Sequence, residues 1–434
     1  MPTTKHILLF GAGKSATVLI DYLGKICLQK QWICTIADAD EQLLKMKTAS
    51  MPQLQSQVIQ IEAEEQRRSL INAADVVISM LPPALHILVA KDCLILRKHL
   101  LTASYIDPAI RALEKEIEAA GLLFLGEMGL DPGIDHMSAM KLIHSIQSKG
   151  GEIDSFKSHC GGLVAPESDT NPWHYKISWN PRNIVTAGKA GAIYKLNNSI
   201  KEVPYEQIFN ACELVTIDGI GELAFYPNRD SLSYIPLYGL DTAQTFIRTT
   251  LRYPAFCAGW QKIIEAKLTD DATMIDTDHL SYGRFLREQL AAHHVQLDTS
   301  KLEQQFEMLG LYNNHSINKG MQSAAAILQD IIEEQWELEH HDKDLIVMLH
   351  EIDYTINNNK HGIKSSLIVK GDDSLHTAMA KTVGLPLGIA ATLLLENKID
   401  LSGLHIPTIP AIYLPVLNEL ANEGIRFEEV EVQA

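Results

Sequence analysis

Three arginines in the second half of the chain stand where they could bind an anion. Arg229 lies in the turn-forming run Pro227–Asp230, while Arg248 and Arg252 flank Thr249–Leu251. A guanidinium group can grip a carboxylate through two parallel hydrogen bonds, so these residues could hold an acidic ligand. Because the chain has 54 acidic residues, ion pairs within the protein are the alternative role for each arginine.

Other residue types could move protons or act as a nucleophile. The segment Gly126–His136 contains three glycines, one proline and three carboxylates, which predicts a site loop rather than a regular element. Asp131 in this loop could act as an acid or base, and capping the helix after Gly133 is its alternative role. Cys160 precedes two glycines and could be a nucleophile or an acid, whereas a buried cysteine at a strand end is the simpler interpretation.

The first residues carry a glycine pattern suited to a dinucleotide. The apolar run 6–10 passes directly into Gly11-Ala12-Gly13, and Ala16 takes the third position of a G-x-G-x-x-A motif. Gly11 permits a tight turn, and Gly13 lets the main chain approach a pyrophosphate at a helix N-terminus. An ATP-type phosphate loop is excluded because its first glycine would fall at Leu8. The candidate contacts in this loop are Gly11, Gly13, Lys14 and Ser15.

Strand and helix signals alternate regularly over residues 1–127. Strand-like runs occur at 6–10, 32–37, 56–61, 75–81, 99–104 and 122–126. Helix-like stretches separate them at about 14–30, 40–48, 63–73, 84–97 and 108–120. This order predicts a Rossmann-like, doubly wound parallel sheet that binds a dinucleotide.

Polar residues follow several of these strands, at the edge where open α/β sheets bind ligands. Asp38 ends the second strand and could accept hydrogen bonds from a ribose 2′-hydroxyl, which favours NAD over NADP; capping the helix near Asp40 is the alternative. NADP stays possible because two nearby lysines could bind a 2′-phosphate: Lys45 and Lys47. Leu81 and Pro82 follow the fourth strand. They could lead the chain across the cofactor and contact it, or they could form a plain strand-to-helix turn. The hydroxyl-rich turn containing Ser104 and Tyr105 is the stronger candidate.

Beyond the first domain the pattern changes. Residues 128–254 and 342–376 predict a mixed-sheet α+β domain, and 255–341 predict a helical subdomain. Residues 377–434 predict a helix and a strand that pack back towards the first domain. The expected fold class is therefore α/β, with a Rossmann-like sheet and a second, mixed domain.

Composition narrows the class of partners. The net charge of −17 argues against nucleic acid and acidic lipid, and no uninterrupted apolar run of eighteen residues appears. The six cysteines include no C-x-x-C pair, which is typical of a reduced, cytoplasmic protein. None of the 17 histidines stands in H-x-x-x-H or H-E-x-x-H, so no metal is expected.

Several loops together resemble the saccharopine dehydrogenase family, and within it the glutamate-forming branch. They include SMLPPALH, TASYIDPAI, GEMGLDPGIDHM, CGGLVAPESDTNPWHYKISWNPR, YPNRDSLSYIPLYGL and FIRTTLRYPAFCAGW. The resemblance spans nearly the whole chain. It implies a Rossmann-like domain, a mixed α/β substrate domain, a helical domain and a homodimer.

The resemblance also implies site residues. The saccharopine contacts would be Ser104, Tyr105, Arg229, Thr250, Leu251 and Arg252. The nucleotide contacts would be Gly11, Gly13, Asp38, Leu130, Asp131, Pro132 and Asn180. This chain departs from the NADP-using fungal members at its glycine loop and Asp38, and Asn180-Pro181-Arg182 replaces a serine-rich stretch.

The implied reaction is oxidation of saccharopine by NAD(P)⁺, followed by hydrolysis of the imine to glutamate and 2-aminoadipate 6-semialdehyde. Proton transfer needs a group that titrates near neutral pH. Asp131 is the first candidate, followed by Cys160 and Tyr105. Two alternatives are a related secondary-amine dehydrogenase, such as carboxynorspermidine dehydrogenase, and a nucleotide-binding protein without turnover.

Overall fold

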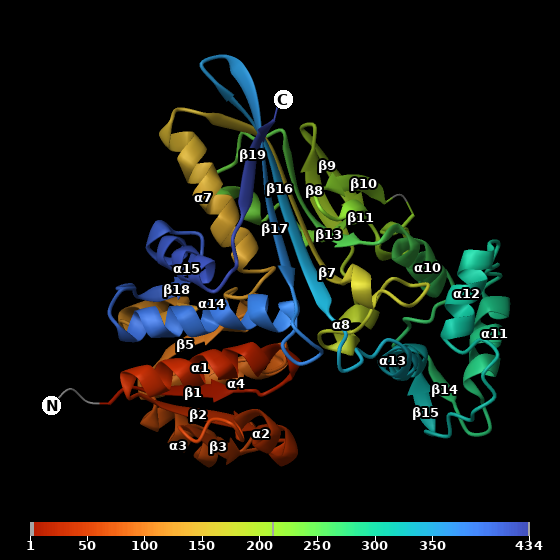
Figure 1. The fold of residues 1–434 in the computed structure, drawn as a ribbon, viewed down its shortest axis with the longest axis horizontal. Helices are drawn as coiled ribbons and strands as arrows, with labels where there is room; N and C mark the ends of the chain where they lie inside the picture. Colours follow the sequence, from red (N-terminus) through yellow and green to blue (C-terminus); the bar gives the residue numbers. More distant parts are fainter. Residues whose placement is uncertain (1–3, 211, 433–434) are drawn as a thin grey trace. The chain divides into compact units, whose positions relative to one another are not determined.

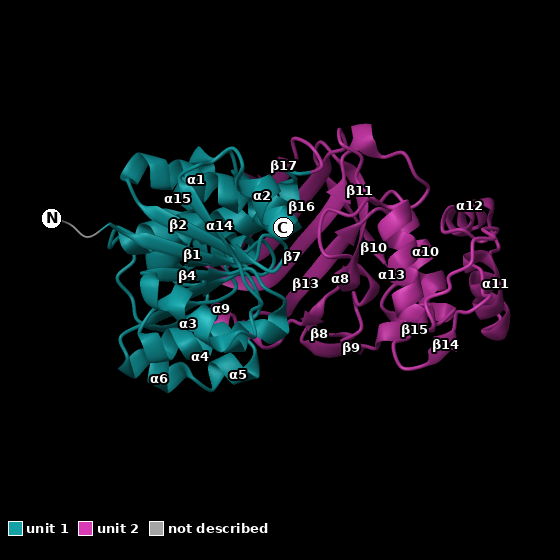
Figure 2. Cartoon of the chain, turned by 90° about the horizontal axis from the view of Figure 1, so that it is seen from below, with its two compact units in different colours: residues 1–150, 375–428 teal, residues 151–374, 429–434 magenta. Residues whose placement is uncertain are grey.

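The computed structural model describes residues 4–210 and 212–432, and the chain divides into two compact units (Figure 2). Unit 1 comprises residues 1–150 and 375–428. Unit 2 comprises residues 151–374 and 429–434. Each unit is built on its own large β-sheet.

Unit 1 contains a seven-stranded parallel sheet in the order β18-β6-β5-β4-β1-β2-β3 (Figure 1). Its strands are β1 (His6–Phe10), β2 (Ile33–Asp38), β3 (Leu54–Val58), β4 (Val76–Ser79), β5 (His99–Thr102), β6 (Leu123–Leu125) and β18 (Gly403–His405). The direction of strand order reverses between β1 and β4, and open α/β sheets bind ligands at the carboxyl ends of the strands at such a point. The predicted Rossmann-like fold is confirmed.

Helices cover both faces of this sheet. α1 (Thr17–Lys30) and α14 (Ala378–Leu395) lie on one face, whereas α3 (Glu64–Ala73), α4 (His86–Leu96) and α6 (Glu114–Ala119) lie on the other (Figure 2). The remaining helices of unit 1 are η1 (Lys14–Ala16), α2 (Glu41–Thr48), η2 (Pro83–Leu85), α5 (Pro108–Arg111), α7 (Ile134–Ser148) and α15 (Pro410–Asn422). The middle strands are enclosed by apolar side chains, as a parallel sheet requires.

α14 is the most apolar helix of unit 1. By length and composition alone it could cross a membrane, yet 78% of this 18-residue helix is buried inside the protein. It approaches α1 closely, since a Cβ atom added at Gly384 would lie 2.9 Å from Cβ of Leu19. Its small residues therefore allow α14 to serve as a core helix beside the one that follows the glycine loop.

Unit 2 contains a mixed sheet of ten strands, with the central order β10-β11-β13-β7-β16-β17-β19 and with β8, β9 and β12 at its side. The central strands are β7 (Glu152–Val164), β10 (Glu213–Ile217), β11 (Gly221–Pro227), β13 (Thr245–Arg252), β16 (Asp344–Ile356), β17 (Asn359–Lys370) and β19 (Glu428–Val432). The side strands are β8 (Ala192–Leu196), β9 (Ser199–Val203) and β12 (Arg229–Asp230).

The helices of unit 2 are η3 (Pro166–Ser168), α8 (Pro181–Val185), η4 (Tyr205–Gln207), α9 (Tyr234–Tyr238), α10 (Pro254–Glu265), α11 (Tyr282–Ala292), α12 (Ser300–Met308) and α13 (Ala324–Gln335). Side chains of α8, α10, α11, α12 and α13 belong to one aromatic core. A short ladder joins β14 (Met274–Asp276) to β15 (Met321–Ser323). Trp173, Trp260 and Trp336 are fully buried and surround Phe256. This core anchors α10, which directly follows β13.

The C-terminal segment differs in part from its expected place. α14, β18 and α15 belong to unit 1, but β19 joins the sheet of unit 2 beside β17. A strand adds to whichever sheet edge offers unpaired main-chain groups, and its own sequence does not specify that edge.

Replacing Gly384 with Val should lower the melting temperature (Tm), because the added side chain would meet both Leu19 and main-chain atoms of the first helix. Overpacking of this kind costs about 1–3 kcal/mol, or roughly 1–3 °C in a protein of this size. Thermal unfolding followed by circular dichroism measures the change. Lys91→Val, at an exposed position of α4, is the control; equal Tm values for both variants would contradict this packing.

Candidate functional site

The glycine loop has the geometry needed to receive a phosphate. Gly11 has φ +98°, and a Cβ atom there would lie 2.8 Å from the carbonyl oxygen of Met80. At Gly13 a Cβ atom would meet no atom within 4 Å, so space lies open beside the main chain. Lys14 is exposed and Ser15 half-buried, and both stand in η1 just before α1. Contact with a cofactor stays a prediction for these four residues.

Asp38 is joined to the glycine loop rather than to a helix end. Its Oδ2 accepts a 2.7 Å hydrogen bond from the Ala12 N–H, and its Oδ1 accepts one from the Asp40 N–H. The side chain that caps α2 is Asp40, which accepts hydrogen bonds from the N–H groups of Gln42 and Leu43. Asp38 therefore holds a carboxylate at the carboxyl end of β2, the position where a ribose is expected.

The two lysines considered for a 2′-phosphate differ in their surroundings. Lys45 is exposed and pairs with Glu41 within α2. Lys47 instead donates a 2.5 Å hydrogen bond to the carbonyl oxygen of Gly13. Burial lowers the pKa of Lys47 to about 8, against the opposing attraction of Asp38. Lys47 thus stabilises the glycine loop through a hydrogen bond to its main chain.

A hydroxyl and imidazole network occupies the carboxyl ends of β4 and β5. His86 lies within 2.8 Å of both the Ser79 and Ser104 hydroxyls, and Thr102 lies 3.4 Å from the same ring nitrogen as Ser104. The sequence predicted Ser104 but missed His86, although His86 ends the SMLPPALH run that carried the family resemblance. Tyr105 is half-buried beside Ser104.

The turn before α4 contains the other two candidates of this edge. Leu81 packs partly against the apolar core of unit 1, and Pro82 is exposed. Leu81 therefore has a structural role in addition to its predicted contact with the cofactor.

The loop between β6 and α7 is tightly folded. The Asp131-Pro132 peptide bond is cis, and the Gly129 N–H donates to the Pro132 carbonyl at 3.0 Å. A Cβ atom at Gly133 would lie 2.0 Å from the Gly129 carbonyl oxygen, so only glycine fits. Within this loop Leu130 and Pro132 are buried and Asp131 is half-buried.

Buried ionisable groups support this loop. The Asp135 carboxylate accepts a 2.6 Å hydrogen bond from the Gly133 N–H at the start of α7. His136 lies 2.9 Å from the Glu127 carboxylate, and both side chains are buried. These contacts fix the backbone on both sides of Asp131, whose catalytic role stays a prediction.

In unit 2, strand register places Cys160, Thr250 and Arg252 on one face of the sheet. Cys160 on β7 is paired with Thr250 on β13, Tyr226 on β11 is also paired with Thr250, and Arg252 is two residues farther along β13. Leu251 points to the opposite face, where it belongs to a separate apolar core. Its side chain is thereby occupied in packing, which leaves only its main chain for the predicted substrate contact.

Arg252 is buried without a carboxylate partner. Only 6% of the residue is exposed, and its guanidinium lies over the rings of Tyr175 and Phe256 at 5.3 and 5.5 Å. One Nη donates to the Leu251 carbonyl oxygen, but Nε has no partner. Burial raises the pKa of Tyr226 to about 12, so this neighbour is a neutral phenol rather than a counter-ion. Among the described residues, no carboxylate lies within ion-pair distance of Arg252.

The other two arginines differ from Arg252. Arg229 is exposed, and its φ of 52° marks a left-handed turn just beyond β11. Arg248 is buried, with its guanidinium 4.5 Å from the ring centroid of Tyr234. Contact between Arg229 and the substrate stays a prediction.

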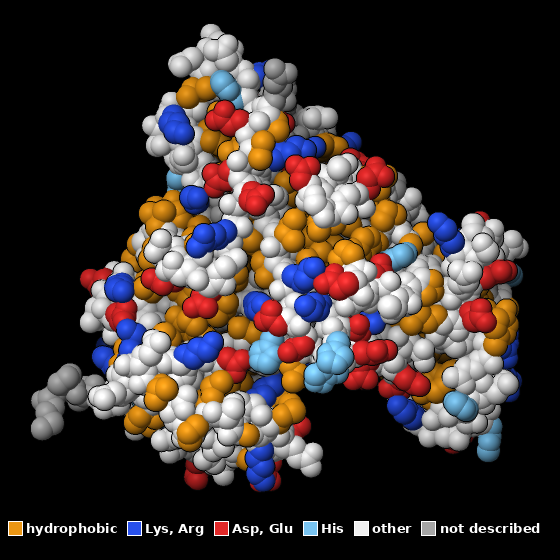
Figure 3. All heavy atoms as spheres, viewed as in Figure 1, with side chains coloured by type: hydrophobic (Ala, Val, Ile, Leu, Met, Phe, Trp, Pro, Cys, Tyr) orange, Lys and Arg blue, Asp and Glu red, His pale blue; other side chains and the backbone are white. Residues whose placement is uncertain are grey.

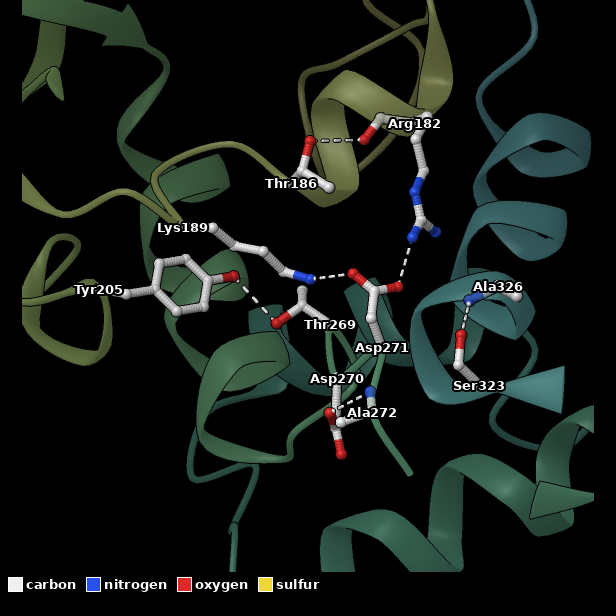
Figure 4. Close-up of polar contacts among 10 residues, drawn as sticks. All are labelled: Arg182, Thr186, Lys189, Tyr205, Thr269, Asp270, Asp271, Ala272, Ser323 and Ala326. Carbon is white, nitrogen blue, oxygen red and sulfur yellow. Dashed lines mark hydrogen bonds and ion pairs between the residues drawn. The ribbon is translucent and has the colours of Figure 1, made fainter. Parts of the chain in front are cut away.

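Asn180 has a structural role at the start of α8. Its side-chain oxygen accepts a 2.9 Å hydrogen bond from the Arg182 N–H. Figure 4 shows how the segment that follows is held: the carboxylate of Asp271 pairs with both Arg182 and Lys189. Contact between Asn180 and a nucleotide stays a prediction.

Charges on the surface do not gather by sign on the face drawn in Figure 3. Basic and acidic side chains are interspersed there, and histidines lie among the acidic residues. Among the described residues, no group of three or more His, Cys, Asp or Glu could hold a metal ion. The candidate site residues therefore fall into two separate groups: the glycine loop and the hydroxyl network in unit 1, and the buried arginine in unit 2.

Two family models match the chain from end to end. The saccharopine dehydrogenase NADP binding domain matches residues 7–125, and the saccharopine dehydrogenase C-terminal domain matches residues 129–425. The chain belongs to the saccharopine dehydrogenase family. The first of these models agrees with a nicotinamide cofactor in unit 1.

Individual relatives agree with this membership. The chain is 31% identical to saccharopine dehydrogenase (NADP(+), L-glutamate-forming) of Saccharomyces cerevisiae over 99% of both chains. It is also 31% identical to alpha-aminoadipic semialdehyde synthase of Arabidopsis thaliana over 99% of this chain but 45% of that protein. It therefore spans about half the length of some curated relatives.

A solved structure shows the same fold. The apo histidine-tagged saccharopine dehydrogenase (L-Glu forming) from Saccharomyces cerevisiae matches with a TM-score of 0.89 and 29% identity. The match covers 99% of this chain and 100% of that chain.

Replacing Arg252 with Met should raise the Tm of the ligand-free protein, by about 2–5 °C, because it removes a buried charge that no carboxylate compensates. Differential scanning calorimetry measures the change. Arg248→Met is the matched control and should lower the Tm, since it removes the stacking on Tyr234. A large fall in Tm for Arg252→Met would show that the guanidinium stabilises the fold rather than awaiting a ligand.

Proposed function

We propose that this protein is an NAD(P)-dependent oxidoreductase that acts on the CH–NH bond of saccharopine. The products are glutamate and 2-aminoadipate 6-semialdehyde. The observation that carries this proposal is the buried guanidinium of Arg252, which lacks a protein carboxylate. Such a cation is costly unless a ligand supplies the anion.

Saccharopine suits the positions of the arginines. It carries three carboxylates, whereas the protein has a net charge of −17, so binding requires local cations. Register places Arg252 opposite Ala224, and Arg229 lies two residues beyond the last residue of β11. The two are about five residue steps apart along the sheet, roughly 16 Å. Two long side chains at that spacing suit an elongated acid with carboxylates at both ends.

The reaction needs a hydride acceptor and a proton acceptor. NAD(P)⁺ held by the glycine loop and Asp38 would supply the first, as acceptor of the hydride on the lysine-side carbon beside the bridging nitrogen. Loss of the nitrogen proton gives an imine, and addition of water then releases the two products. Asp131 is the proposed proton-handling group, with Cys160 and Tyr105 as further candidates. The pairing of Cys160 with Thr250, on the face that carries Arg252, supports including it among these candidates.

We propose NAD as the preferred cofactor. The Asp38 carboxylate is fixed at the end of β2 by the Ala12 N–H, where it can accept hydrogen bonds from a free 2′-hydroxyl and would repel a 2′-phosphate. Lys47 is bonded to Gly13 and Lys45 to Glu41, so each lysine already has a partner. The name of the yeast relative and the name of the family model both refer to NADP, so a measured preference between NAD⁺ and NADP⁺ tests this proposal directly.

The two alternatives are weaker. A polyamine substrate would call for acidic side chains, and the buried guanidinium opposes it. A nucleotide-binding protein without turnover would have no use for an uncompensated charge in unit 2. Cytoplasmic location and a homodimeric assembly stay predictions.

The purified protein with saccharopine and NAD⁺ should produce absorbance at 340 nm together with glutamate and the semialdehyde. Arg229→Ala and Arg252→Lys should each lower kcat/KM for saccharopine by about 30-fold or more, because a charged, bidentate contact is lost. Arg284→Ala removes an exposed ion pair of α11 and should leave kcat/KM unchanged. Formation of lysine and 2-oxoglutarate would show that the other C–N bond is cleaved, and normal turnover by both arginine variants would exclude this pocket.

Wild-type protein should show at least a tenfold higher kcat/KM with NAD⁺ than with NADP⁺. Asp38→Asn removes the charge but keeps an acceptor for the Ala12 N–H, so the ratio should fall about tenfold. Asp40→Asn keeps a good cap for α2 and should preserve the ratio. A wild-type preference for NADP⁺ would refute the assignment to Asp38.

A further inference from the structure

The turn that links β4 to α4 delivers His86 to the carboxyl edge of the sheet. Pro82 and Pro83 direct the chain through η2, and α4 then begins at His86. Its ring reaches back to the last residue of β4 and to the turn after β5. A histidine at this helix start is thus placed among the residues at the ligand edge of the sheet.

The ring of His86 joins two serines. Nδ1 lies 2.8 Å from the Ser79 hydroxyl, and Nε2 lies 2.8 Å from the Ser104 hydroxyl. Burial lowers the pKa of His86 to about 4, so the ring is neutral at pH 7 and has one donor and one acceptor nitrogen. One serine therefore donates to the ring and the other accepts from it.

The ring is better suited to orientation than to proton transfer. Ser79 is fully buried, so the series of hydrogen bonds from Ser104 through His86 leads into the core and not to solvent. A general base would also need a pKa closer to the working pH.

The main chain of Ser104 is fixed independently of the ring. Its N–H donates to the Thr102 hydroxyl at 3.2 Å, and its carbonyl accepts from the Glu127 N–H at 3.0 Å. The side chain is half-buried. The main freedom left to Ser104 is rotation of its hydroxyl, and His86 is the group that limits it.

We propose that His86 is a positioning residue, which orients the Ser104 hydroxyl to contact the substrate. The inference rests on the proposed function, since Ser104 is a saccharopine contact only as the family resemblance predicts it. The proposal adds His86 as a residue that acts through Ser104 and does not itself contact the substrate.

Two isosteric variants test the contacts of the two ring nitrogens separately. The amide of Gln overlays Nε2 of histidine, so His86→Gln keeps the contact with Ser104. The amide of Asn overlays Nδ1, so His86→Asn keeps only the contact with Ser79. We expect KM for saccharopine to rise about tenfold in His86→Asn and to stay within about twofold of wild type in His86→Gln, with kcat little changed in both.

Further variants test the route through Ser104. Ser104→Ala should raise KM about as much as His86→Asn, and the double variant should show no additional rise, because both changes remove one interaction. His99→Gln alters a half-buried histidine at the other end of β5 and should leave KM unchanged. Binding of NAD⁺, followed by fluorescence, and Tm should stay near wild type in the His86 variants and confirm that the domain is folded.

The results would distinguish failure of this inference from failure of the proposed function. Equal KM values in His86→Asn and His86→Gln, or a further rise in the double variant, would overturn the positioning role while wild-type turnover still supports the proposed function. Absence of saccharopine turnover in wild-type protein would refute the proposed function and, with it, this inference.

Discussion

The burial of one positive charge is the constraint on which the second unit depends. Arg252 lies on aromatic faces, has a neutral phenol as neighbour and has no carboxylate within reach among the described residues. The surrounding sheet and the tryptophan core must supply enough apolar burial to offset the desolvation of that charge. The charge is thereby kept at a cost to the stability of this unit in the ligand-free protein.

The first unit handles polarity differently. Its ligand edge contains hydrogen bonds among neutral hydroxyls and a neutral imidazole, the Asp38 carboxylate that accepts from the glycine loop, and the buried carboxylates of Glu127 and Asp135. Neutral, satisfied groups cost little when buried and keep fixed directions. The polar groups of this edge therefore have partners within the protein, whereas Arg252 of the second unit has no carboxylate partner among the described residues.

Much of the first unit could be read from the sequence because its signals are local. Parallel strands that are buried on both faces are largely apolar, so the predicted runs 6–10, 32–37 and 75–81 marked β1, β2 and β4 to within two residues. Glycine at position 11 is required by a main-chain contact in the adjoining turn. Residues beyond predicted strands also fell at one edge, because parallel strands share their carboxyl ends.

The sequence by itself determined the fold class, the family and the residue types at the ligand edge. Only the tertiary structure decided which partner each side chain meets. It placed the Leu251 side chain in an apolar core on the opposite face of the sheet from Thr250 and Arg252, since successive side chains of a strand point to opposite faces. It also brought His86 between two serines 7 and 18 residues away, and it gave the last strand to the second sheet. These pairings join distant residues, whose meeting depends on the packing of the whole chain rather than on any local pattern.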